Sequence, residues 1–67
     1  MVRYFHLEEG GGRLHEITEG EYEFRLRKYA TWKNPHRVDL VGMMRPGFGF
    51  ESPFGTCFAV EMPDGKA

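Results

Sequence analysis

Residues able to carry out catalysis or to bind a metal are few and widely spaced in this chain of 67 residues. Its three histidines, His6, His15 and His36, lie in separate segments, and their spacings match no zinc site. If the segments around His6 and His15 pair as strands, the two rings can meet across the glycine-rich stretch between them. Such a pair would offer a metal only two ligands, so we predict that the chain binds no metal and no cofactor.

Cysteine and the glycine-rich stretches give no better candidates for catalysis. Cys57 is the only cysteine, and a reactive thiol needs a helix N-terminus or a nearby cation that lowers its pKa. The residues around Cys57 instead predict a strand in which it is a small buried residue. The glycine-rich stretches lack the lysine of a phosphate-binding loop, and a chain this short has little room for a substrate pocket. We predict that the protein is not an enzyme.

An aromatic loop is the feature that most favours binding. Residues 46–55 contain Phe48, Phe50 and Phe54 among glycines and prolines, and the three rings cannot share one strand face. Exposed rings can anchor a protein partner or stack on unpaired bases. Alternatively, the loop folds back and the rings fill the open end of a barrel. Trp32 is expected in the core or at a barrel rim, with anchoring of a partner as its alternative role.

Basic residues are concentrated in the middle third of the chain, whereas both ends are acidic and the net charge is only −1. This basic group, with one aromatic residue in it, consists of Arg25, Arg27, Tyr29, Lys33, Arg37 and Arg45. On a barrel strand, such a group can hold single-stranded nucleic acid, although the low net charge argues against binding to phosphates. The plainer interpretation is that opposite charges face each other on neighbouring strands.

The stretch 21–33 is expected to position much of this group. From Glu21 to Arg27, polar and apolar residues alternate without interruption, which is typical of a half-buried strand. A change of parity near 27–29 predicts a bulge in that strand.

A helix over residues 19–30 is the alternative for the same stretch. Thr18 and Glu21 have the spacing of a capping box. Against the helix, Phe24 would fall on its wrong side and Gly20 would lie in its first turn, where glycine is unfavourable. We therefore favour the strand.

Four further strands are expected from the apolar patterns, at residues 2–7, 14–17, 37–45 and 56–62. In the last of these, Phe58, Val60 and Met62 are expected to face the core. Five short strands predict an all-β fold, an antiparallel meander closed into an SH3-like or OB-like barrel, because a flat sheet of this size leaves one apolar face in water. An α+β fold, with one helix near 19–30 on a sheet, is the alternative.

The chain length predicts a single domain over residues 1–67 and a shortage of buried surface. A core of this size rarely supplies more than ~3–5 kcal/mol of stability, and a lone cysteine provides no internal disulfide. We therefore expect association, either as a homodimer or with a larger protein. Because no apolar run approaches the ~18 residues of a membrane span, we expect no membrane contact and a location in the cytoplasm.

Together, these features predict a small non-catalytic binding module that acts as a regulator, an inhibitor or an accessory subunit. We expect it to dock onto another protein through the aromatic loop 46–55, Trp32 and the neighbouring basic residues. The alternative is a small β-barrel that binds single-stranded nucleic acid through Arg25, Arg27 and Tyr29 together with the same phenylalanines.

Overall fold

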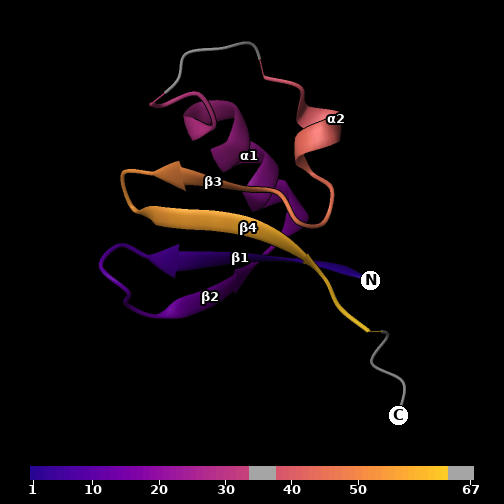
Figure 1. Cartoon of the computed structure of the whole chain (residues 1–67), viewed down its shortest axis with the longest axis horizontal. Coiled ribbons are helices and arrows are strands. Elements are labelled where there is room, and N and C mark those ends of the chain that lie inside the picture. Colours follow the sequence, from indigo (N-terminus) through magenta and orange to yellow (C-terminus); the bar gives the residue numbers. More distant parts are fainter. Residues whose placement is uncertain (34–37, 64–67) are drawn as a thin grey trace.

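The structure, a computed structural model, describes residues 1–33 and 38–63. These residues form a four-stranded antiparallel sheet and two short helices (Figure 1). In chain order the elements are β1 (Val2–Glu8), β2 (Leu14–Ile17), α1 (Glu19–Tyr29), α2 (Leu40–Met43), β3 (Gly49–Ser52) and β4 (Gly55–Glu61). Across the sheet the strand order is β2-β1-β4-β3. The strands β1 and β4 therefore form the centre of an open sheet.

Glycines shape the two hairpin turns. Between β1 and β2, Gly10 and Gly11 have φ angles of 80° and 78°, which residues with a side chain rarely adopt. At the start of β4, Gly55 has a φ of 135° and lies directly against the backbone of β1. The second turn is therefore packed against the central strand, whereas a Cβ atom added at Gly10 or Gly11 would meet no described atom within 4 Å.

Helix α1 begins where the sequence provides a cap. The side-chain oxygen of Thr18 accepts a hydrogen bond from the backbone N–H of Glu21 at 3.1 Å, which satisfies one of the free donors of the first turn. One turn apart on the same side of the helix, Tyr22 and Leu26 are fully buried against the sheet. The cap and these two residues fix where the helix begins and which side it buries.

The strand predicted over residues 21–33 is therefore wrong, and the alternative helix near 19–30 is confirmed. Alternation and helical spacing coincide at Tyr22 and Leu26, which fit both patterns. Because these two residues are enough to attach a short helix to the sheet, Phe24 does not have to reach the core. It lies instead in solvent, 62% exposed.

Removing the helix cap is expected to weaken the fold. In the variant Thr18→Ala, the N–H of Glu21 loses its side-chain acceptor, and we expect the free energy of unfolding to fall by ~1 kcal/mol. Urea denaturation followed by far-UV circular dichroism would measure this change. The variant Thr18→Ser keeps the hydroxyl and serves as the control. A loss in Thr18→Ser as large as that in Thr18→Ala would contradict the role of the cap.

A small core lies between α1 and one face of the sheet. Its buried apolar residues are Tyr4, Tyr22, Leu26, Phe50, Cys57 and Ala59. The ring of Tyr22 lies 4.7 Å from that of Tyr4 and 5.4 Å from that of Phe50, measured between centroids. The Tyr22 hydroxyl lies 3.3 Å from the carbonyl oxygens of Met43 and Phe48 and can donate to either. Tyr22 thus joins α1 to α2 and to the segment before β3.

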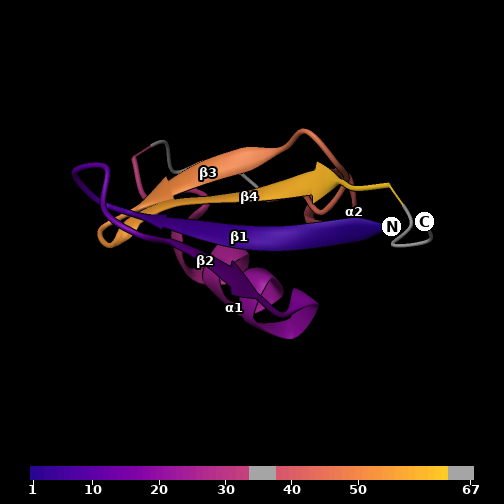
Figure 2. The same cartoon turned by 90° about the horizontal axis from the view of Figure 1, so that it is seen from below.

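The opposite face of the sheet has no covering helix or strand among the described residues, because α1 lies on the other side (Figure 2). Phe5 on β1 and Phe58 on β4 are paired across the strands on this face, with ring centroids 5.7 Å apart. Leu7 and Val60 flank them and remain half-buried, and Leu14 on β2 is 56% exposed. One apolar face of the sheet therefore stays in contact with water.

The orientation predicted for the last strand is wrong. Phe58 and Val60 lie on the open face, and Met62 lies beyond the end of β4. The residues that face α1 are Cys57 and Ala59, both buried. Small residues let the helix approach the sheet closely, so the larger side chains of this strand are left on the other side.

Two further predicted segments differ from the structure. The strand predicted over 37–45 is replaced by α2, where the carboxylate of Asp39 accepts a hydrogen bond from the backbone N–H of Gly42 at 3.4 Å. Arg37 lies outside the described residues. The predicted loop 46–55 contains β3 and the turn to β4. The five-stranded SH3-like or OB-like barrel is therefore wrong, and the fold combines an open four-stranded sheet with two helices.

Candidate binding surfaces

Large aromatic side chains remain in solvent along α1 and at the β3–β4 turn. In addition to Phe24, Trp32 is 49% exposed and Phe54 is 58% exposed. The half-buried ring of Tyr29 makes an edge contact with the ring of Phe54 at a centroid distance of 5.9 Å. We call the surface made by Phe24, Lys28, Tyr29, Trp32, Lys33 and Phe54 the aromatic–lysine surface.

Two ammonium groups lie against these rings. The Nζ atom of Lys28 is 5.8 Å from the ring centroid of Phe24 and 5.5 Å from that of Tyr29. The Nζ atom of Lys33 is 5.3 Å from the ring centroid of Trp32. These distances are typical of cation–π contacts. The surface therefore offers a partner apolar area and positive charge together.

A shallow groove of about 270 Å³ extends this surface between the end of α1 and β3. Tyr29 and Lys33 line one side, and Phe48, Phe50 and Glu51 line the other. The Nζ atom of Lys33 pairs with Oε2 of Glu51 at 3.1 Å. The groove therefore brings the buried ring of Phe50 and the half-buried ring of Phe48 next to Tyr29 and Lys33.

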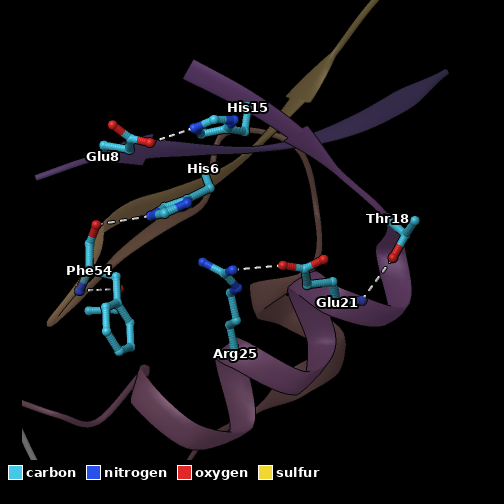
Figure 3. A network of polar contacts seen from close by, with 8 residues as sticks. His6, Glu8, His15, Thr18, Glu21, Arg25 and Phe54 are labelled. Carbon is cyan, nitrogen blue, oxygen red and sulfur yellow. Dashed lines mark hydrogen bonds and ion pairs between the residues drawn. The ribbon is translucent and has the colours of Figure 1, made fainter. Parts of the chain in front are cut away.

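Hydrogen bonds on several sides hold the turn that carries Phe54 (Figure 3). The backbone N–H of Phe54 donates to Oγ of Ser52 at 3.2 Å. Its carbonyl oxygen accepts a hydrogen bond from the backbone N–H of Glu9 at 3.1 Å and lies 3.0 Å from Nε2 of His6. Because a carbonyl oxygen can only accept, Nε2 of His6 carries a proton in this contact. The exposed ring of Phe54 thus stands on a turn that is fixed to β1.

His6 and His15 lie opposite each other on β1 and β2, with ring centroids 6.1 Å apart. The pairing of these two segments is therefore confirmed. Nε2 of His15 lies 2.7 Å from a carboxylate oxygen of Glu8, and this hydrogen bond holds the pKa of Glu8 below its ordinary value. Within residues 1–33 and 38–63, no group of three or more His, Cys, Asp or Glu residues could hold a metal. His36 lies outside these ranges.

Arg25 points from α1 towards the sheet (Figure 3). Its Nη2 atom pairs with Oε2 of Glu21 at 2.7 Å, whereas its Nη1 atom is buried without a nitrogen or oxygen partner among the described residues. Burial raises the pKa of the Cys57 thiol, and a hydrogen bond with Arg25 offsets part of this rise. Since Cys57 is also fully buried, the thiol is kept protonated and away from solvent.

The ten residues predicted to contact a partner are divided by the fold. Four of them belong to the aromatic–lysine surface: Tyr29, Trp32, Lys33 and Phe54. Phe50 is buried in the core, and Phe48 is half-buried against it. Phe24 and Lys28 were missing from the predicted set, although their four-residue spacing places them on one side of the alternative helix.

The predicted basic residues do not form one surface. The guanidinium of Arg25 is directed inward, towards the sheet. Arg27 is exposed and pairs with Glu23 at 3.0 Å. Arg45 is exposed in the turn after α2, and Arg37 lies outside the described residues. Arg25 and Arg27 pair with glutamates four residues earlier on α1, so the interpretation that opposite charges face each other on neighbouring strands is wrong for these two residues.

Neither helix in the described part of the chain is both long enough and apolar enough to cross a membrane. No protein-family model, curated protein or solved structure matches the chain. The function is therefore inferred from the surfaces described above.

Proposed function

We propose that the chain is a small non-catalytic binding module that docks onto another protein through the aromatic–lysine surface and so regulates, inhibits or assists it. The observation that carries this proposal is the exposure of Phe24, Trp32 and Phe54 beside a core of only six buried apolar residues among those described. Burying a large apolar side chain contributes roughly 1.5–3 kcal/mol. Clustered apolar side chains left in solvent are typical of interaction sites.

The charges on this surface favour a partner with acidic groups around an apolar pocket. Lys28 lies against two rings, and no carboxylate among the described residues pairs with it. Buried aromatic side chains often supply most of the binding energy of a protein interface, and charges at its rim speed association and select the partner. Phe24, Trp32 and Phe54 would fill pockets in the partner, while Lys28 would meet its acidic rim.

Single-stranded nucleic acid is the second candidate ligand, favoured by the contact between lysines and exposed rings. A base stacked on an aromatic side chain gains ~1–3 kcal/mol, and a nearby ammonium group can bind the phosphate. However, Glu51 already neutralises Lys33, and the net charge of the chain is −1. Since nucleic-acid affinity depends mainly on positive charge, we place protein docking first.

Removing two exposed rings is expected to abolish docking. The wild-type chain and the double variant Trp32→Ser/Phe54→Ser would be immobilised and exposed to lysate of the source cells. We expect the wild type to retain at least one protein whose capture falls by about tenfold or more in the variant, since ~1.4 kcal/mol corresponds to a factor of ten. Both side chains are about half exposed or more, so the fold should persist, as a cooperative thermal transition would verify.

Val41→Ser is the matched control, because Val41 is 86% exposed on α2 and lies outside the aromatic–lysine surface. Capture of the same proteins by the wild type and by the double variant would contradict docking through this surface. Retention of the chain on a single-stranded oligonucleotide at low salt, if lost in Lys28→Ala/Lys33→Ala, would favour nucleic acid instead.

A further inference from the structure

The sheet face opposite α1 is a second apolar surface, which meets the aromatic–lysine surface at a cavity lined in part by Leu7, Thr56, Trp32 and Lys33. We call it the outer sheet face and define it by Phe5, Leu7, Leu14, Thr56, Phe58 and Val60. The antiparallel register places Phe58 opposite Phe5 and Thr56 opposite Leu7. The rings of Phe5 and Phe58 are stacked, with an interplanar angle of 25°. Two nearly parallel rings thus lie at the centre of this face, on the two central strands.

Charged side chains beside the outer sheet face are paired with each other. Arg3 on β1 donates through Nε to Oε2 of Glu16 on β2 at 2.6 Å, and a second bond joins its Nη2 to the other carboxylate oxygen. Glu51 on β3 is paired with Lys33. Because each of these positive charges has a negative neighbour, this face has no net charge that would repel an identical face.

We propose that two copies of this chain associate through their outer sheet faces to form an eight-stranded sandwich. The strands contain 7, 4, 4 and 7 residues. At ~3.3 Å per residue and ~4.8 Å between strands, the sheet outline covers roughly 350 Å². Because side chains protrude from each face, the accessible area is larger than this outline. Two such faces would bury on the order of 1,000 Å² in total, which is close to the area of the smallest specific interfaces.

The pairing of residues allows such a sandwich without a clash of charges. A two-fold axis between the sheets, parallel to β1 and β4, sets β1 of each copy over β4 of the other. Phe5 of one copy then lies over Phe58 of the other, and Glu16 lies over Gly49, which has no side chain. Under the same operation, Glu51 lies over Leu14. No like charges oppose each other, and the four central rings meet in one layer, as in aligned sheet packing.

A second copy fits this face better than a charged partner does. A two-fold interface uses the same patch on both copies and must therefore be self-complementary. An apolar centre with internally paired charges meets this condition. The association would also relieve the shortage of core, because it adds a second apolar layer to a sheet that α1 covers on only one side.

Sedimentation equilibrium on the purified full chain, from about 1 µM to about 1 mM, tests this proposal over the range of weak to moderate affinities. We expect the wild type to pass from one to two copies within this range. The variant Phe58→Lys is expected to raise the dissociation constant by at least about tenfold, because two like charges would be buried at the centre of the interface. Leu14→Glu tests the same face at a side chain already exposed in the single copy, so folding is retained, and it would set a carboxylate over Glu51 of the other copy.

Phe24→Lys is the matched control, because Phe24 lies on α1, on the other side of the sheet. It should leave the dissociation constant unchanged while impairing capture of partner proteins through the aromatic–lysine surface, so the two proposals can fail separately. A wild type that sediments as a single copy throughout would overturn the proposal. Equal association in Leu14→Glu would also overturn it, as would a single copy that binds a different protein through this face.

Discussion

Gly55→Ala is expected to unfold most of the protein at room temperature. Gly55 has a φ of 135°, a conformation that costs a residue with a side chain ~1–3 kcal/mol. A Cβ atom at this position would also collide with the carbonyl oxygen of Leu7 and lie 2.9 Å from the backbone nitrogen of Glu9. Both are backbone atoms of the first hairpin, so they cannot move without disturbing β1. We expect the free energy of unfolding to fall by more than ~3 kcal/mol in total, which is comparable to the whole stability of a domain of this size.

Far-UV circular dichroism and urea denaturation would measure this loss. Gly11→Ala is the matched control, because Gly11 also has a positive φ of 78°, but a Cβ atom added there would meet no described atom within 4 Å. In this control, the free energy of unfolding should fall only by the conformational cost of ~1–2 kcal/mol. Equal losses in the two variants would show that the close approach of the turn to β1 contributes nothing.

Tyr22→Ala is expected to cost ~3–5 kcal/mol, because it removes a fully buried aromatic side chain from the centre of the core. The ring contacts two others, those of Tyr4 and Phe50, and both would border the resulting cavity. Phe24→Ala is the control on the same helix, since that ring is in solvent. If Phe24→Ala lowers the free energy of unfolding as much as Tyr22→Ala does, the assignment of the core is contradicted.

The hydroxyl of Tyr22 extends this prediction to alkaline pH. Burial, the largest cause, raises the pKa of Tyr22 to about 12, with the nearby Cys57 and Tyr4 as further causes. Because the folded pKa lies above the ordinary value of 10, the stabilising contribution is fully present below pH 10 and is lost as the pH rises towards about 12. The variant Tyr22→Phe should lose this part of the alkaline destabilisation. Urea denaturation at a series of pH values would check it, with neutral pH as the reference.

Local pattern identified three of the four strands, because the glycines at 10–12 separate β1 from β2 and because β4 lies between Gly55 and Pro63. The same pattern could not decide whether the segment that forms α1 is a strand or a helix. Tyr22 and Leu26 satisfy a period of two and a helical turn equally well, and the choice between them depends on long-range pairing. Once β1 and β4 form the centre of the sheet, one face needs a cover, and the segment after Thr18 has both a cap and a buried side.

Side-chain size, rather than periodicity, decided which side of β4 faces the core. Alternation correctly separated Phe58 and Val60 from Cys57 and Ala59, but hydrophobicity alone favoured the larger pair for the interior. Helix α1 packs over the smaller pair because it can approach them closely. The sequence pattern alone does not show which pair faces the helix, since the answer depends on the distance between α1 and the sheet.

The candidate binding surface was predictable only in part. Phe54 was identified from its place in a loop rich in glycine and proline, whereas Trp32 was expected first in the core or at a barrel rim and is 49% exposed. Phe50 could not be distinguished from them, although it pairs with Cys57 on β4 and is buried. The contribution of Lys28 depends on the helix, which brings its ammonium group over the ring of Phe24. The surface therefore became visible only once the helix was known.

The two central strands come from opposite ends of the described chain, with Val2 opposite Glu61. This arrangement sets the order of assembly. The first hairpin and α1 involve only neighbours in sequence, whereas the middle of the sheet must wait for contacts between residues far apart in the chain, which slows folding. During synthesis, β1 keeps one edge open until β4 leaves the ribosome. Truncation within β4 would remove the middle of the sheet rather than its rim.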